Sequence, residues 1–162
     1  MNRLAISILL LGMLSAASAQ LEVGLEIKRN IFIRAEPIEA TVTIRNLAGK
    51  EVLLRDIEGS QWFGFEIMKG GDTPIGPLEV NYKNEPQILL SGGSIRRTIN
   101  LLRLYPISDY GTYTIRAAIF FHETGKFITS EPLRVDISEG RKLWTQTVGV
   151  PASKDRDRKS VV

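Results

Sequence analysis

Alternation of apolar and polar residues is the feature of this sequence that most limits its possible folds. Residues 21–27 read LEVGLEI, residues 39–46 read EATVTIRN and residues 111–122 read GTYTIRAAIFFH. A period of two places successive side chains on opposite faces of an extended strand, so each run predicts a half-buried β-strand. No stretch after residue 20 has the period of an amphipathic helix. The pattern predicts an all-β chain and excludes a parallel β/α architecture.

Weaker patterns predict further strands at 51–57, 63–68, 87–90, 96–105 and 127–138, and a mostly irregular loop over 72–86. Turn residues separate them. Ile99 and Leu101 belong to the expected inward face of 96–105. Pro132 indicates an edge or a bulge, because proline cannot donate to a ladder. About 7–9 strands at this spacing predict an antiparallel β-sandwich, with a closed barrel as the structural alternative.

The first residues resemble a secretory signal. Arg3 precedes an apolar run from Leu4 to Leu14, and Ala17 and Ala19 stand where signal peptidase needs small residues. We therefore expect residues 1–19 to be a signal peptide, with an uncleaved anchor as the alternative. A β-sandwich domain is expected over 20–150, followed by a disordered polar tail over 151–162.

Composition narrows the setting and the partners. The net charge is +3, and no clustered basic face is evident, so nucleic acid is not an expected partner. The chain has no cysteine, and none of its asparagines lies in a glycosylation sequon. These absences favour a bacterial periplasmic or extracellular protein. After signal removal we expect it to be soluble, with no membrane insertion.

A short motif resembles immunoglobulin-like domains. Residues 109–113 read DYGTY, which is similar to the D-x-G-x-Y run that opens the penultimate strand of that family. The resemblance implies an immunoglobulin-like sandwich in which the Tyr113 hydroxyl bonds to upstream backbone, the tyrosine corner. Ile115 stands in place of the family's cysteine.

A second resemblance covers more of the chain. Residues 35–38 read AEPI, 42–46 read VTIRN, 50–54 read KEVLL and 90–94 read LSGGS. This layout is similar to bacterial exported immunoglobulin-like domains, and to the BsuPI type, a family named for a proteinase inhibitor. The motifs consist of turn and core residues, so the resemblance implies fold more than activity.

No motif predicts catalysis or a cofactor. His122 is the only histidine, and no nucleophile motif accompanies it, so a solvated hairpin histidine is the better interpretation. Asp155 and Asp157 alternate with arginines and do not form a calcium loop. The Gly-Gly pairs at 70–71 and 92–93 lack the lysine of a phosphate loop. We expect no enzyme, no cofactor and no metal site.

The sequence instead predicts a non-catalytic binding or structural module of the cell envelope, which contacts another protein through its loops. Candidate contact residues are Trp62, Tyr82, Pro74 and Pro77, the last three within the 72–86 loop. An inhibitor of an exported proteinase is the first alternative, and carbohydrate binding through Trp62 is the second. The opposing interpretation of Trp62 is a core residue.

Overall fold

The structure is a computed structural model that describes residues 21–79, 83–140, 147–148 and 159–160. It is nearly all β, which confirms the predicted fold class. The strands are β1 (Leu21–Ile27), β2 (Ile31–Ile33), β3 (Glu39–Asn46), β4 (Val52–Leu54), β5 (Phe63–Lys69), β6 (Thr73–Pro74), β7 (Gln87–Leu89), β8 (Ser94–Asn100), β9 (Gly111–Phe121), β10 (Lys126–Thr129), β11 (Leu133–Ser138), β12 (Thr147–Val148) and β13 (Lys159–Ser160). One 3₁₀ turn, η1 (Leu101–Arg103), completes the described elements.

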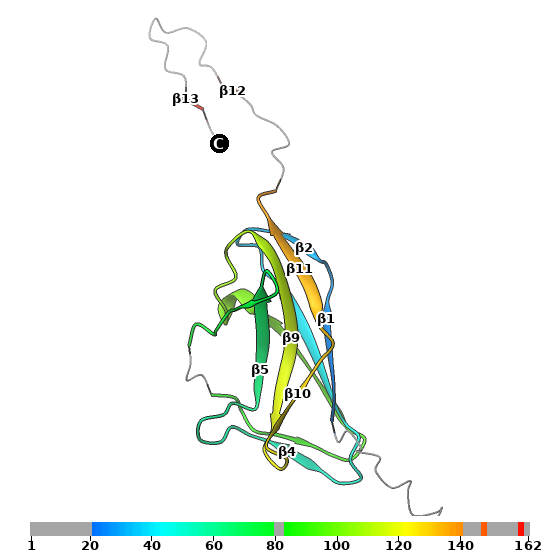
Figure 1. Ribbon diagram of the computed structural model, residues 1–162. Coiled ribbons are helices and arrows are strands. Elements are labelled where there is room, and N and C mark those ends of the chain that lie inside the picture. The colour runs from blue at the N-terminus through cyan, green and yellow to red at the C-terminus, as the bar shows by residue number, and fades with distance from the viewer. Residues whose placement is uncertain (1–20, 80–82, 141–146, 149–158, 161–162) are drawn as a thin grey trace, which may run out of the picture.

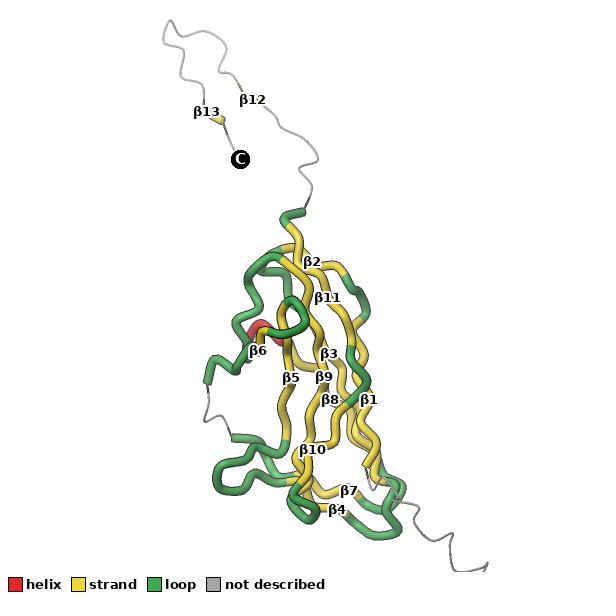
Figure 2. The backbone as a smooth tube through the Cα atoms, in the orientation of Figure 1, coloured by secondary structure: helices red, strands yellow, loops and turns green. Residues whose placement is uncertain are grey.

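Two separate sheets form the layers of the sandwich (Figure 1). The first has the order β1-β3-β8, and the second has the order β2-β11-β9-β5-β6, with β10 also paired to β9. All these pairs are antiparallel except β2 with β11. The pair β4-β7 lies across one end of the sandwich (Figure 2), and β12 pairs with β13. Because the two sheets share no ladder, the closed-barrel alternative is wrong for the described residues.

The inward faces agree with the alternation in the sequence. On β3, Val42 and Ile44 are at most 1% exposed, and on β9, Ile115 and Ile119 are fully buried. These residues join one apolar cluster that both sheets contribute to. Burying such side chains contributes about 1.5–3 kcal/mol each relative to leaving them exposed. A chain without disulfides is thus held by a single core.

Two predicted strands end earlier than expected. The 51–57 strand is confined to β4, because the chain turns after it and Asp56 directs its carboxylate to the Trp62 backbone N–H, at 2.8 Å. The 96–105 strand ends at Asn100, whose Oδ1 accepts the Leu102 N–H at 3.1 Å and caps η1. Leu101 is buried as predicted, but in η1 and not in a strand.

The predicted 127–138 strand is divided into β10 and β11. Both pair with β9, but the register shifts between Thr129 opposite Ala118 and Leu133 opposite Ile115. Three residues, 130–132, therefore face two residues of β9, which is a β-bulge. Ser130 bridges it: its N–H donates to the Ala117 carbonyl and its Oγ accepts the Ala117 N–H. The bulge expected near Pro132 is confirmed.

The short strand β2 was not predicted. Its ladder partner β11 is far away in sequence, and the two run parallel, with Ile31 opposite Asp136 and Ile33 opposite Ser138. Phe32 is buried, whereas Ile31 and Ile33 are more than half exposed. The turn that follows places Ala35 at φ 65°, a left-handed conformation that costs a residue with a Cβ about 1–2 kcal/mol.

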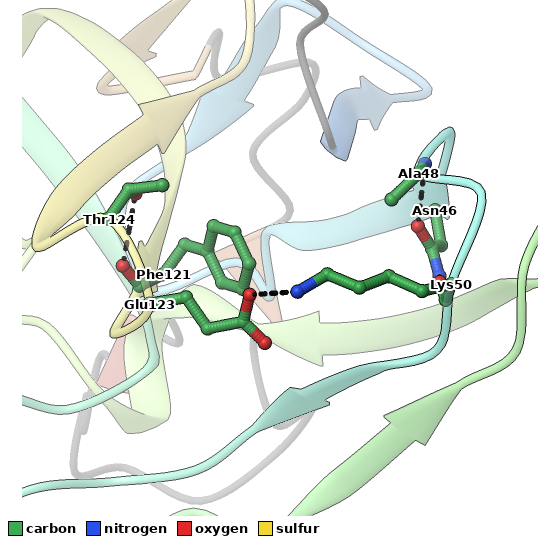
Figure 3. Close-up of polar contacts among 6 residues, drawn as sticks. All are labelled: Asn46, Ala48, Lys50, Phe121, Glu123 and Thr124. Atoms are coloured by element: carbon green, nitrogen blue, oxygen red, sulfur yellow. Dashed lines mark hydrogen bonds and ion pairs between the residues drawn. The ribbon is translucent and has the colours of Figure 1, made fainter.

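Asn46 joins the turn after β3 to the end of β7, and Figure 3 shows its bonds within that turn, to Ala48 and Lys50. Its side chain is fully buried, and its Nδ2 lies 2.8 Å from the Lys50 carbonyl, 2.9 Å from that of Leu89 and 3.1 Å from that of Leu90. Its Oδ1 accepts the Ala48 N–H at 2.8 Å. One side chain thus satisfies the backbone of the turn after β3 and of the end of β7.

The tyrosine-corner contact is present. Tyr113 is 1% exposed, and its hydroxyl donates to the Asp109 carbonyl at 2.9 Å. The contact fixes the chain where it enters β9.

Two predicted segments lie mainly outside the described residues: the signal peptide, 1–19, and the polar tail, 151–162, of which only Lys159–Ser160 is described. Within the described residues, no helix has the length and apolar character needed to cross a membrane.

Candidate anion-binding recess

Of the four residues predicted as partner contacts, the three that the structure describes do not form one surface. Trp62 is fully buried, and its Nε1 donates to the Glu85 carbonyl at 3.2 Å, so the core interpretation is confirmed and the prediction of a Trp62 contact surface is wrong. The carbohydrate hypothesis loses the residue on which it depended. Pro74 is exposed within β6, Pro77 is half-buried, and Tyr82 lies outside the described residues.

The sequence also singled out His122 and the glycine pairs, and the structure describes the surroundings of each. His122 is half-buried, packs its ring edge-on against Phe121, and has a buried Nδ1 without a hydrogen-bond partner in the described structure. No group of three or more His, Cys, Asp or Glu among the described residues is placed to hold a metal ion. Gly70 and Gly71 have positive φ, as a tight turn requires.

The structure instead reveals a basic recess of about 350 Å³ at the open edge of the sandwich. β8 and η1 form one side of the recess. The start of β5 and the residues Lys83 and Asn84 form the other side. The described residues that line it are Phe63, Lys83, Asn84, Arg97, Thr98, Ile99, Asn100, Arg103 and Leu104. Three of these carry a positive charge and none carries a negative charge.

Arg97 is the central residue of the recess. It alternates in phase with the half-buried Ile95 and Ile99, so its side chain points between the sheets and not into solvent. Its guanidinium carbon lies 4.7 Å from the centroid of the Phe63 ring and 5.5 Å from that of Trp62. Aromatic faces stabilise a cation, and they leave its N–H groups free for an acceptor.

One nitrogen of this guanidinium is both buried and unpaired. Arg97 Nη1 is shielded from solvent and has no hydrogen-bond partner in the described structure. Buried polar groups in proteins are nearly always hydrogen-bonded, and a buried donor without an acceptor costs about 1–3 kcal/mol or more. Arg97 therefore retains one hydrogen-bond donor that the described structure does not use.

The carboxylate of Asp56 accepts hydrogen bonds from residues in and beside the wall of the recess. Asp56 accepts the Trp62 N–H, the Asn84 N–H at 2.7 Å and the Asn84 side-chain amide at 3.2 Å. The Asn84 amide also reaches the Phe63 carbonyl at 3.3 Å. These bonds hold the segment at Asn84 against β5, so the wall is a fixed surface.

The three basic side chains of the recess form no ion pair among the described residues. The ion pairs among the described residues are Arg29–Glu36, Lys50–Glu123, Lys69–Asp109 and Arg96–Glu26. None of these involves Lys83, Arg97 or Arg103. The excess positive charge in a partly enclosed site attracts an anion.

A larger depression of about 610 Å³ on the outer face of the first sheet is less suited to this role. Its lining contains Arg29 and Arg96, each paired with a glutamate, and Lys28, which takes part in none of the four ion pairs of the described residues but is exposed to solvent. The Arg29 hydrogen bond, and then the Ile33 N–H, lower the pKa of Glu36, so this carboxylate stays charged beside the arginine. Among the described residues that line the depression, no cation is both unpaired and held between the sheets as Arg97 is.

Sequence reasoning missed Arg97, although a signal was present. Residues 95–99 read IRRTI, and Arg97 occupies the inward position between two isoleucines. A charged residue on the apolar face of a strand needs a partner or a special role. The predicted 72–86 loop was a better guide, because two residues near its end, Lys83 and Asn84, line the recess.

No family model matches the chain, and no curated protein matches it either. Among solved structures, it is similar to the "X-ray structure of Northeast Structural Genomics Consortium target SoR45", with 15% sequence identity and a TM-score of 0.44. The match covers 79% of this chain and 95% of that one. The all-β sandwich class of this chain rests on its own strand pairing.

Proposed function

We propose that this chain is an exported, non-catalytic binding module of the cell envelope, which holds an anionic group of a partner protein in the basic recess. The observation that carries the proposal is the buried, unpaired Nη1 of Arg97. Lys83 and Arg103 line the same recess and add to its positive charge. The anionic group is a carboxylate or a phosphate, because both accept paired N–H donors from a guanidinium.

The same proposal assigns the sandwich to the immunoglobulin-like domains, with a layout similar to the BsuPI type. The Tyr113 contact with Asp109 supports this assignment. The apolar run from Leu4 to Leu14, followed by Ala17 and Ala19, supports export.

Small anions test the recess directly. Glutarate and pyrophosphate are titrated separately into the purified chain while the ¹⁵Nε resonance of Arg97 and the indole resonance of Trp62 are followed. We expect one of the two anions to shift both resonances with saturation, and the tighter binder identifies carboxylate or phosphate as the preferred group. Saturable shifts of the Trp62 resonance that are the same in Arg97→Gln and in the wild type would refute the site.

Arg45→Gln is the matched control for that variant. Arg45 lies on the outer face of β3, is exposed and takes part in none of the four ion pairs of the described residues, so the substitution removes the same charge elsewhere. A pull-down from the envelope fraction with the wild type, Arg97→Gln and Arg45→Gln then tests the partner. We expect a protein retained by the wild type and by Arg45→Gln to be lost with Arg97→Gln.

Inhibition of an exported proteinase is a second candidate, supported by the shape of the 72–79 segment. Ile75 N–H donates to the Ile67 carbonyl at 2.8 Å, and Leu78 N–H donates to the Leu104 carbonyl at 2.7 Å. Leu78 itself is 57% exposed on this tethered segment. An inhibitor presents such a side chain on a constrained loop to a protease cleft. Equal rates of secreted proteases with and without the chain would remove this candidate, and loss of inhibition in Leu78→Asp would support it.

A further inference from the structure

The free edge of β8 lies beside the recess and offers unpaired backbone groups. In its sheet β8 pairs only with β3 among the described strands. The Leu101 N–H donates to the Ile38 carbonyl, and the Asn46 N–H donates to the Gly93 carbonyl, both at 2.9 Å, in the same register as the β3-β8 ladder. Bonded residues alternate along an antiparallel strand, so Arg96 and Thr98 direct their N–H and C=O groups away from β3.

We propose that β8 accepts an extended acidic segment of a partner protein as an added antiparallel strand, with the acidic side chain against Arg97. The inference rests on the proposed function, because it names the ligand of the same recess. Main-chain bonds to Arg96 and Thr98 supply the docking, and the side chain that faces Arg97 supplies the selectivity.

The phase of the ladder determines which residue of the added strand meets Arg97. Residues opposite Arg96 and Thr98 exchange hydrogen bonds with them, and the residue between these two lies opposite Arg97. Directly opposite residues project from the same face, about 4.5–5.5 Å apart at Cβ. Its side chain therefore enters the recess, where a carboxylate pairs with the Arg97 guanidinium that lines it.

The neighbouring positions favour apolar side chains. Two residues to either side of the acidic one, the added strand faces Ile95 and Ile99, both half-buried at the edge of the core. The favoured segment thus alternates as apolar, any, acidic, any, apolar.

Charge argues against a second copy of this chain as the added strand. Two β8 strands paired about Arg97 would place like charges opposite each other, which is destabilising. An inward-pointing charge on an edge strand discourages indiscriminate pairing in the same way. The positive charge of Arg97 instead favours the addition of a strand that carries an acidic side chain.

The test uses a short peptide of alternating valine and threonine, with glutamate replacing the central valine. We expect its binding to the purified chain to slow hydrogen exchange of the Arg96 and Thr98 amides. Replacing the glutamate with glutamine leaves the protein unchanged and is expected to weaken binding about tenfold or more. Arg97→Gln is expected to bind the two peptides equally, whereas Arg45→Gln is expected to behave like the wild type.

Backbone methylation separates strand addition from simple anion binding. Methylating the amide nitrogens of the two threonines beside the glutamate removes donors to β8 and is expected to abolish binding, whereas methylating the glutamate amide, which faces away from β8, is tolerated. Equal binding of all methylated peptides, or of the glutamate and glutamine peptides to the wild type, would overturn the proposal.

The two proposals fail in different ways. If glutarate or pyrophosphate shifts the Arg97 resonance but the peptide does not bind, strand addition is overturned and the anion site stands. If neither small anions nor the peptide bind, both proposals are overturned.

Discussion

Removing the Asn46 side chain tests how much this buried side-chain amide contributes to the stability of the fold. Its Nδ2 has two protons for three carbonyl acceptors, so it makes at most two full hydrogen bonds, and its Oδ1 accepts a third. At about 1 kcal/mol net for each bond, Asn46→Ala is expected to lower the free energy of unfolding by about 3 kcal/mol. The buried Leu89 carbonyl, left without this donor, adds to the cost.

Urea denaturation followed by tryptophan fluorescence measures this difference, and calorimetry should show a Tm lower by about 10 °C. Asn30→Ala is the control, because Asn30 is exposed and accepts through its backbone carbonyl, from the Asp136 N–H. We expect that control to change stability by no more than about 0.5 kcal/mol. A loss below about 1 kcal/mol in Asn46→Ala would refute the reasoning, because it would mean that water replaces the amide at little cost.

Three further predictions concern the backbone and one ion pair. Tyr113→Phe keeps the buried ring but removes the bond to Asp109, so we expect a loss of about 1 kcal/mol in urea denaturation; no loss would contradict the role of that contact. The Lys69 hydrogen bond lowers the pKa of Asp109, and the same bond raises the pKa of Lys69. The stability difference between the wild type and Asp109→Asn should therefore be present at neutral pH, decline as pH falls below 3.8 and decline again above 10.5; urea midpoints that differ equally at all pH values would contradict it. Ala35→Gly removes left-handed strain but adds chain entropy, so thermal denaturation should show a change between zero and about 1 kcal/mol of stabilisation, and Ala35→Val should destabilise.

The alternation of apolar and polar residues predicted the strands that have one solvent-exposed and one buried face. β1 and β3 were predicted to the residue, because a shift by one would expose Val23 or Ile44. The end of β8 was not predicted correctly, because an apolar run such as Leu101-Leu102 is compatible with a strand and with a helical turn. The Asn100 cap decides between them, and it is a local hydrogen bond with no periodic signal.

Non-local contacts account for the other differences. β2 forms because its three residues pair with β11, which is distant in the sequence. A run of three residues is too short to show a period that would predict such a partner. The recess has the same origin: Asn84 and Arg97 line it together because Asp56 holds the segment at Asn84 and the two sheets pack face to face. The sequence could reveal the inward phase of Arg97, but not the rings of Trp62 and Phe63 beneath it.

The place of β11 between β2 and β9 has a kinetic consequence. Residues from the start and the end of the sandwich share one ladder, so the second sheet stays incomplete until Leu133–Ser138 is available for pairing. Distant pairings of this kind delay folding into the range of milliseconds to seconds. Meanwhile β9 keeps an unpaired apolar edge, which is a template for association with other chains. A chain truncated before Leu133 should therefore collect in aggregates and not as a smaller sandwich.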